Sequence, residues 1–127
     1  MSQVPDTLRY TKTHEWLRQE TDGSITVGIT DHAQAQLGDL VYVELPPPGA
    51  QLTAGDACAV VESVKAAADV YAPLTGAVAA TNEVLTSAPE QVNLDPYGIG
   101  WLLRVSAAAM PADTLDAEAY RALTEAG

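Results

Sequence analysis

The chain is divided into many short apolar runs by turn-forming residues, and this spacing most constrains its fold. The runs have lengths typical of β-strands rather than helices. Asp22-Gly23 separates two of them, and such a pair readily adopts the positive φ angles of a tight turn, so residues 16–29 are predicted to form a hairpin. Residues 46–49, Pro-Pro-Pro-Gly, end another run because prolines cannot donate hydrogen bonds to a ladder. The spacing therefore predicts a mainly β chain.

The remaining strands are predicted from the pattern of apolar residues. Over residues 25–29, apolar residues alternate with a polar or a small one. Over residues 41–45, the same alternation places Val41, Val43 and Leu45 on one face. The apolar runs at 58–61 and 70–74 are continuous, which suits strands buried on both faces. Alternation returns over residues 101–105 and predicts a last strand.

Two segments favour helices. Thr30 is a suitable N-cap for a short helix over residues 31–37, and Gly38 is suited to end it. No repeat of fixed period and no long polar linker divides the chain, so we expect residues 1–127 to form one domain. Near the C-terminus, Thr114 is predicted to cap a helix whose apolar face carries Leu115, Ala119, Ala122 and Leu123.

The charge balance excludes several classes of partner. Seventeen acidic residues and six basic ones give a formal net charge of -11, which disfavours binding to nucleic acids and to anionic membranes. Hydrophobic residues make up 47% of the chain, enough for a buried core, and no run approaches the ~18 apolar residues of a transmembrane span. The first residues lack the pattern of a secretory signal, so we expect a cytoplasmic protein.

No motif in the sequence predicts a catalytic centre. Cys58 is the only cysteine, which excludes an internal disulfide, and its apolar surroundings favour a core residue. His14 and His32 are the only histidines, which does not support a metal site of three or four ligands. The sequence also contains no glycine-rich nucleotide-binding motif and no Gly-x-Ser-x-Gly nucleophile elbow. A small enzyme with Cys58 or Ser63 as its nucleophile and an unmodified adaptor are the alternatives outside the class of carriers.

Lys65 is distinguished by its surroundings. The chain has only two lysines, and Lys65 lies between Glu62 and Asp69 among alanines, flanked by two strand-like segments. Such an arrangement predicts a hairpin tip from which the side chain projects into solvent. A solvated surface lysine has the same appearance. The small neighbours also leave room for a modifying enzyme or for a long attached group.

These residues resemble the lipoylation turn of the glycine cleavage H-protein family. The turn reads Glu62-Ser63-Val64-Lys65-Ala66 and is followed by Asp69. Val64 distinguishes it from biotin carriers, which place methionines beside the lysine, and from lipoyl domains of 2-oxoacid dehydrogenases, which place aspartate before it. Ala68 departs from the usual serine or threonine, and we expect it to forgo a turn hydrogen bond. The resemblance also covers His14-Glu15-Trp16, Gly28-Ile29-Thr30, Leu37-Gly38-Asp39, Tyr71-Ala72-Pro73, Asn93, Pro96-Tyr97 and Gly100-Trp101.

The resemblance implies a fold and a function. The fold is a lipoyl-type barrel-sandwich hybrid of two small antiparallel sheets, with a short internal helix and a C-terminal helix. Lipoate is amide-linked to Lys65 by a lipoate-attaching enzyme. The chain is then a non-catalytic shuttle that we expect to be monomeric and to work in the bacterial cytoplasm.

The implied partners act in sequence on the carried group. A pyridoxal-phosphate glycine decarboxylase loads an aminomethyl group, a tetrahydrofolate-dependent aminomethyltransferase removes its methylene, and a dihydrolipoyl dehydrogenase takes the electrons. A lipoyl relay that donates lipoyl groups to other 2-oxoacid dehydrogenase complexes is the alternative, with the same fold and the same lysine.

The resemblance further implies a cleft that shields the loaded arm. Glu15, His32 and Asp69 occupy the matching positions, with Thr13 and Ile29 nearby, and a carboxylate there offers charge-assisted hydrogen bonds to a cationic amine. The residues alone also permit other interpretations. Glu15 is then a solvated charge at a strand end, Asp69 an acceptor for turn amides, and His32 an exposed helical residue.

Overall fold

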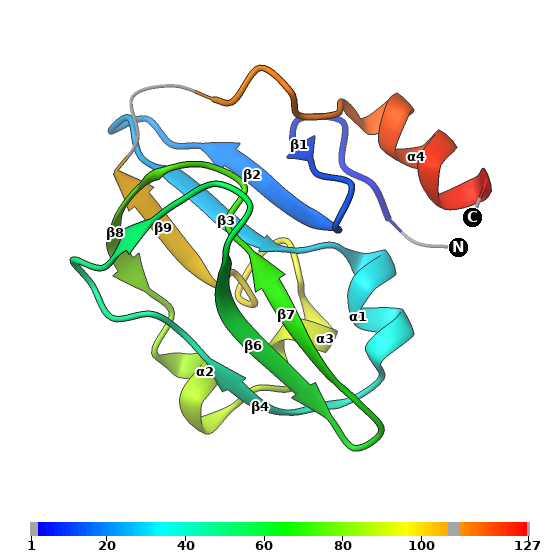
Figure 1. Cartoon of the computed structure of the whole chain (residues 1–127). Helices are drawn as coiled ribbons and strands as arrows, with labels where there is room; N and C mark the ends of the chain where they lie inside the picture. The colour runs from blue at the N-terminus through cyan, green and yellow to red at the C-terminus, as the bar shows by residue number, and fades with distance from the viewer. Residues whose placement is uncertain (1–2, 107–109, 127) are drawn as a thin grey trace.

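The computed structural model describes residues 3–106 and 110–126, which form two antiparallel β-sheets and four helices (Figure 1). The predicted mainly β fold with two small sheets, an internal helix and a C-terminal helix is confirmed, whereas two further short helices were not predicted. The larger sheet has the strand order β1-β2-β3-β9-β8-β5 and the smaller one the order β4-β6-β7. The strands are β1 (Arg9–Tyr10), β2 (Glu15–Gln19), β3 (Ile25–Ile29), β4 (Leu40–Glu44), β5 (Gln51–Leu52), β6 (Ala57–Ser63), β7 (Ala67–Tyr71), β8 (Gly76–Thr81) and β9 (Leu103–Ser106). The helices are α1 (Asp31–Leu37), α2 (Val84–Ser87), α3 (Gln91–Leu94) and α4 (Ala117–Ala126).

The β2–β3 hairpin forms as predicted, but its connection is longer than a tight two-residue turn. The backbone N–H of Glu20 donates to the Ser24 carbonyl at 2.8 Å, and the N–H of Gly23 donates to the Glu20 carbonyl at 3.1 Å. Gly23 has a φ of 91°, whereas Asp22 has no positive φ. The Asp22 carboxylate instead accepts hydrogen bonds from the backbone and the hydroxyl of Ser24. This side-chain cap removes the need for a second residue in the left-handed region.

The alternation predicted for residues 41–45 holds for Val43 and Leu45, which face the core, and fails at Val41 because β4 contains an irregularity. The pairing of β4 with β6 shifts register between Leu40 and Tyr42. Leu40 and Val43 are consequently buried, while Val41 and Tyr42 are exposed. An extra residue in one strand moves all later side chains to the opposite face, and no local pattern reports it.

The continuous apolar runs are also buried on one face only. Ala59 and Val61 of β6 are buried, whereas Cys58 and Val60 are half-buried. In β7, Val70 is buried but its neighbours along the strand are not. The predicted burial on both faces is therefore wrong, since the three-stranded sheet packs a single face on the core and leaves its other face accessible.

Helix α1 has the predicted bounds and caps. The Thr30 hydroxyl accepts a hydrogen bond from the Ala33 N–H at 3.2 Å, and Gly38 ends the helix with a φ of 84°. Asn93, which follows much later in the chain, holds this end in place. Its carbonyl oxygen accepts from the Leu40 N–H at 2.8 Å, and its amide donates to the Gly38 carbonyl at 2.9 Å.

Helix α4 starts after its predicted cap. The Asp116 carboxylate, rather than Thr114, accepts the hydrogen bond from the Ala119 N–H at 2.8 Å. The Thr114 hydroxyl instead accepts from Arg9 Nε at 3.0 Å. The predicted apolar face is also rotated, because the buried residues are Ala117 and Tyr120, with Leu123 half-buried, while Ala119 and Ala122 are exposed.

Two hydrophobic clusters stabilise this arrangement. The larger one lies between the sheets, and the smaller one joins α4 to β1 and β2 through Tyr10, Trp16 and Tyr120. Trp16 is fully buried against Gly28, where an added Cβ would lie 2.6 Å from the indole, so β3 requires glycine at this position. Among the described residues, no helix has the length and apolar character that crossing a bilayer requires.

Candidate functional site

Lys65 lies at the tip of the β6–β7 hairpin, in a turn that Ser63 fixes. The Ser63 hydroxyl accepts hydrogen bonds from the backbone N–H of Lys65 at 3.3 Å and of Ala66 at 3.1 Å. The backbone N–H of Ser63 donates to the Ala66 carbonyl at 2.7 Å. Because backbone groups and Ser63 hold the turn, the exposed Lys65 side chain takes no part in forming it.

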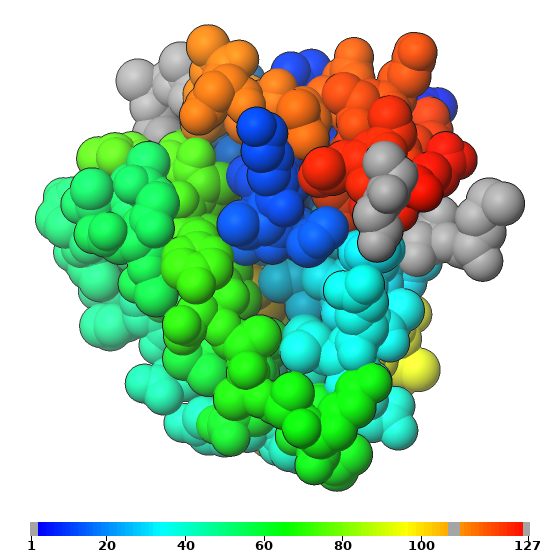
Figure 2. Space-filling model, turned by 45° about the vertical axis from the view of Figure 1, so that its right-hand side comes forward, coloured from blue at the N-terminus to red at the C-terminus, as the bar shows by residue number. Residues whose placement is uncertain are grey.

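The tip projects beside the C-terminal end of α1. An added Cβ at Gly38 would lie 3.4 Å from Lys65 Cε, so the lysine stem passes over this glycine. Val64, beside Lys65, is 82% exposed. In Figure 2 the green hairpin and the cyan α1 lie on either side of a hollow, below the blue residues that precede β2. The attachment point and the hollow therefore share one side of the molecule.

A cavity of about 190 Å³ opens between α1 and β7, and we call it the α1–β7 cavity. Four of the five predicted cleft residues line it, namely Thr13, Glu15, Ile29 and Asp69. Its wall combines apolar side chains with a few polar groups, as expected for a site that holds a small group in a defined orientation. The other lining residues are His14, Ala33, Gln36, Leu37, Val61, Ala68 and Val70.

His32, the fifth predicted cleft residue, does not line this cavity. It is a half-buried residue in the first turn of α1, and its ring packs on that of His14 with 4.8 Å between the centroids. His14 takes the place in the wall instead. The structure therefore places His32 outside the cavity lining, in contact with a residue that forms it.

Glu15 is buried, so its interpretation as a solvated strand-end charge is wrong. Its side chain is 2% exposed, and Oε1 accepts hydrogen bonds from the hydroxyls of Thr11 at 2.6 Å and Thr13 at 2.5 Å. Oε2 accepts a longer one from the Tyr71 N–H at 3.4 Å. Burial raises the Glu15 pKa, and the two threonine hydroxyls oppose that rise. The loop at residues 11–14 covers the strand end and removes the side chain from water.

Asp69 lines the cavity from β7 and is exposed. Within residues 3–106 and 110–126 no backbone amide of the turn donates to its carboxylate, and Ser63 accepts those bonds instead. The alternative role of Asp69 as a turn acceptor is therefore wrong. Ala68 is half-buried against the core and forms part of the cavity wall.

A second cavity, of about 570 Å³, lies on the other side of Glu15. It shares Thr13 and Glu15 with the α1–β7 cavity, and its wall also contains Lys12 and Asp113. Glu15 thus forms part of both walls, and the two threonine hydroxyls that bind its carboxylate define the direction of that group.

His14 is a cavity residue that the sequence did not reveal. Its φ of 72° makes it the only non-glycine residue with a positive φ in the described part of the chain. A side chain in this region costs about 1–2 kcal/mol, so surrounding contacts must hold it. Nδ1 lies 2.7 Å from the hydroxyl of Tyr120 in α4. No sequence pattern links residues so distant along the chain.

The candidate nucleophiles have other roles in the structure. Burial raises the pKa of Cys58 to about 11, so the thiolate required for attack is scarce at neutral pH. The Ser63 hydroxyl is engaged in the turn. The described residues also contain no group of three or more histidine, cysteine or acidic side chains placed to hold a metal ion.

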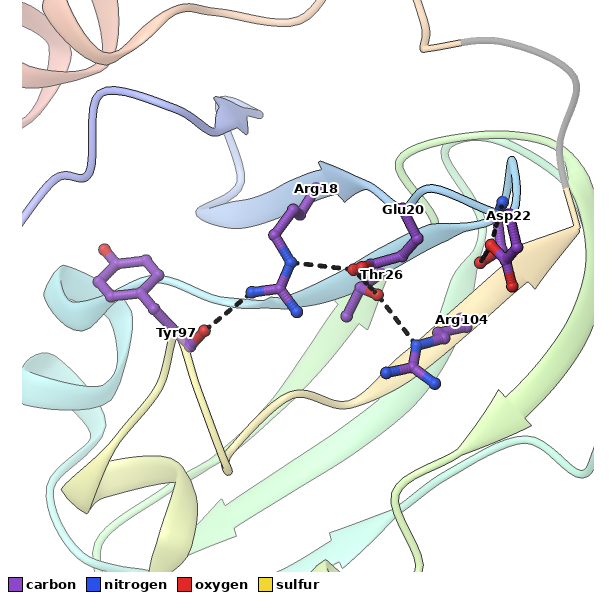
Figure 3. A network of polar contacts seen from close by, with 7 residues as sticks. Arg18, Glu20, Asp22, Thr26, Tyr97 and Arg104 are labelled. Atoms are coloured by element: carbon purple, nitrogen blue, oxygen red, sulfur yellow. Dashed lines mark hydrogen bonds and ion pairs between the residues drawn. The ribbon is translucent and has the colours of Figure 1, made fainter.

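A separate polar network lies on the larger sheet (Figure 3). The Glu20 carboxylate accepts hydrogen bonds from Arg18 Nε at 2.9 Å and from the Thr26 hydroxyl at 2.5 Å, and the Thr26 oxygen accepts from Arg104 Nε at 3.2 Å. The hydrogen bond from Thr26 is the main cause that lowers the Glu20 pKa. Arg104 also stacks over Trp101, 4.6 Å from its centroid. These contacts join β2, β3 and β9 and include no residue of either cavity beside Glu15.

Comparisons with known proteins identify the family of the chain. The family model described as Glycine cleavage H-protein matches residues 8–126. A glycine cleavage system H protein of Halorhodospira halophila is 60% identical over 129 residues, covering 97% of this chain and 96% of the relative. One from Cronobacter sakazakii is 56% identical and covers 98% of both chains.

A solved structure supports the same assignment. The crystal structure of a glycine cleavage system H protein from Mycobacterium marinum superposes with a TM-score of 0.89 at 37% sequence identity. The match covers 96% of this chain and 99% of that one. The family model spans nearly the whole chain, the relatives are of high identity and the fold is shared. This chain therefore belongs to the glycine cleavage H-protein family.

Proposed function

We propose that this chain is a single-domain, non-catalytic lipoyl carrier of the glycine cleavage system, with lipoate amide-linked to Lys65. The observation that carries the proposal is the placement of an exposed lysine on a hairpin tip beside a cavity that contains a buried carboxylate. The relatives are H proteins of the glycine cleavage system, and this supplies the pathway in which such a carrier works.

The residues present fit a lipoyl group. The Lys65 stem passes over Gly38, where an added Cβ would be in van der Waals contact with Lys65 Cε at 3.4 Å. The nearby cavity offers apolar side chains from Leu37 and Val61 to a hydrocarbon arm and polar groups to what the arm carries. When bound, the lipoyl group supplies a dithiolane that accepts the aminomethyl group and two electrons.

The residues of this chain bind and shield what is carried. Glu15 presents a carboxylate whose direction Thr11 and Thr13 fix, and a docked ammonium would gain a charge-assisted hydrogen bond from it. That cation would also favour the ionised form of Glu15, which burial disfavours. The apolar wall excludes water from the docked group, and this slows its hydrolytic loss.

The proposed partners are a pyridoxal-phosphate glycine decarboxylase, a tetrahydrofolate-dependent aminomethyltransferase, a dihydrolipoyl dehydrogenase and a lipoate-attaching enzyme. Each acts on the same arm, so each approaches the side of the molecule that carries Lys65. We propose that the chain works as a monomer in the bacterial cytoplasm. Amidation removes the lysine charge and makes the modified chain about one unit more negative at neutral pH.

Peptide mass mapping of the chain purified from its own host tests the attachment. We expect the mass of an amide-linked lipoyl group on the peptide that contains Lys65 and none on the peptide that contains Lys12, the only other lysine. Reconstitution with the decarboxylase then tests the pathway through glycine-dependent exchange of carbon dioxide. Attachment without exchange would favour the lipoyl relay, and an unmodified Lys65 would refute the carrier assignment.

A further inference from the structure

One hydrogen-bonded chain connects the C-terminal helix to the wall of the α1–β7 cavity. The Tyr120 hydroxyl lies 2.7 Å from His14 Nδ1 and 2.7 Å from the Thr30 hydroxyl. Tyr120 and Thr30 are fully buried, and the Tyr120 ring stacks on Tyr10 with 4.6 Å between the centroids. Thr30 is also the N-cap of α1, so three elements meet at one hydroxyl group.

The number of available hydrogen atoms determines which group donates and which accepts in each of these hydrogen bonds. The Thr30 oxygen already accepts the Ala33 N–H, and its own hydrogen can be donated to Tyr120. Tyr120 then donates its only hydrogen to His14 Nδ1. In the reverse direction, the Thr30 hydrogen would have no other acceptor among the described residues, which is costly at a buried site. The forward direction leaves His14 neutral, with its proton on Nε2.

The backbone of His14 supports this orientation. His14 has a φ of 72°, and its carbonyl accepts a hydrogen bond from the Thr30 N–H at 3.0 Å. A left-handed residue immediately before β2 turns the side chain away from the direction that an extended backbone would give it. The ring therefore reaches α4 and the cavity wall together because the loop is bent at this residue.

We propose that Tyr120 is a positioning residue, which fixes the orientation and the tautomer of His14 in the wall of the α1–β7 cavity. The C-terminal helix thereby helps to shape a cavity that it does not line. The docking of the loaded arm in this cavity rests on the proposed function. The orientation and tautomer of the His14 ring do not depend on it.

Other charged and titratable groups also face His14. His32 packs on its ring from α1, Glu15 follows it in β2, and Asp69 lines the same cavity from β7. Burial, with a contribution from His32, lowers the His14 pKa. A neutral His14 agrees with the direction of hydrogen bonding derived from Thr30. Tyr120 remains protonated as well, since burial raises its pKa to about 12.

Nuclear magnetic resonance of the nitrogen-15-labelled, unmodified chain tests the proposal. In the wild type we expect His14 Nδ1 to be unprotonated and to accept a slowly exchanging Tyr120 hydroxyl proton. Tyr120→Phe removes that donor but keeps the stacked ring, so the His14 pKa should rise and its ring resonances should shift. The wild-type spectrum decides the tautomer even if the variant does not fold.

Tyr10→Phe is the matched control. The Tyr10 ring stacks on Tyr120, but its hydroxyl donates to the Pro5 carbonyl at 2.6 Å and does not reach His14. We expect it to leave the His14 resonances unchanged. A wild-type His14 protonated on Nδ1, or a Tyr120→Phe variant with the wild-type His14 pKa and shifts, would overturn the proposal.

A second measurement separates this proposal from the proposed function. In the lipoylated and loaded chain, Tyr120→Phe should shorten the lifetime of the carried group about fivefold, the equivalent of one neutral hydrogen bond. Tyr10→Phe should not change it. If His14 responds and the lifetime does not, Tyr120 still positions His14 but the cavity is not the docking site.

Discussion

Replacing Glu15 by glutamine should stabilise the fold at neutral pH while weakening the site. Burial raises the Glu15 pKa from its ordinary value of 4.5, in spite of the hydrogen bonds from Thr11, Thr13 and Tyr71. The folded chain therefore holds the proton more tightly than the unfolded chain. Below about pH 4.5 both states are protonated, and as the pH rises through the raised pKa, ionisation reduces stability.

The magnitude follows from the contacts that the variant keeps and loses. Each unit of pKa difference between the folded and the unfolded state corresponds to about 1.4 kcal/mol. Glutamine retains an oxygen acceptor for the hydroxyls of Thr11 and Thr13. The weak 3.4 Å bond from the Tyr71 N–H is lost, which offsets about 0.5 kcal/mol of the gain. We expect the burial penalty on the ionised carboxylate to exceed this loss, so that the variant is more stable than wild type at neutral pH and has the higher Tm.

Urea unfolding of the unmodified chains at acidic and neutral pH measures this effect. The difference between Glu15→Gln and wild type should be small or unfavourable near pH 4 and should become favourable by about pH 7. Glu44→Gln, at an exposed position of β4, is the control and should show no such change. A Glu15→Gln variant that is destabilised equally at both pH values would refute the argument that burial opposes ionisation.

The same substitution should impair the carrier. A neutral amide cannot provide the charge-assisted hydrogen bond that a carboxylate gives to an ammonium, and the difference is about 1.4 kcal/mol. The loaded lipoylated variant should therefore lose its aminomethyl group about tenfold faster than wild type without the folate-dependent partner. An unchanged lifetime would remove Glu15 from the proposed site, whatever its effect on stability.

Three further predictions concern other residues. Lys65→Arg should fold like wild type but gain no lipoyl mass and support no glycine cleavage, and any retained activity would contradict the assignment. Gly28→Ala places a Cβ 2.6 Å from the buried Trp16 indole and should cost about 3 kcal/mol or more in urea unfolding; a loss below about 1 kcal/mol would show that the indole can move. Loading by the decarboxylase should weaken as salt is added, because a chain of net charge -11 is expected to dock on basic surfaces, and insensitivity to ionic strength would exclude such steering.

The sequence predicted the local features of the fold well. The caps Thr30 and Gly38 define α1 by their own side chain and backbone preferences, so local chemistry suffices there. The β4 irregularity could not be predicted, because the slip at Leu40 arises from its pairing with β6. The cap of α4 was misplaced because Thr114 and Asp116 are both suitable caps, and the contact with Arg9 decides between them.

The site was predicted only in part, for a similar reason. The lysine turn is contiguous in sequence, so its motif is visible as a unit. The burial of Glu15 depends on the loop at residues 11–14 and on Tyr71 from a distant strand. His14 and Tyr120 meet only after α4 packs on β1 and β2. Contacts of this kind leave no local pattern, and only the assembled chain shows them.

The position of Lys65 at one exposed hairpin tip has a consequence for how the proposed partner enzymes gain access to the carrier. Because Lys65 and the cavity share one side of the molecule, an enzyme that holds the proposed lipoyl arm would block access for the other proposed partners. The proposed partners would therefore take turns, and the carrier would behave as a diffusing co-substrate for which they compete rather than as a scaffold that assembles them. The ratio of carrier to partner copies, and the rate at which each partner releases it, would then govern the flux of one-carbon units.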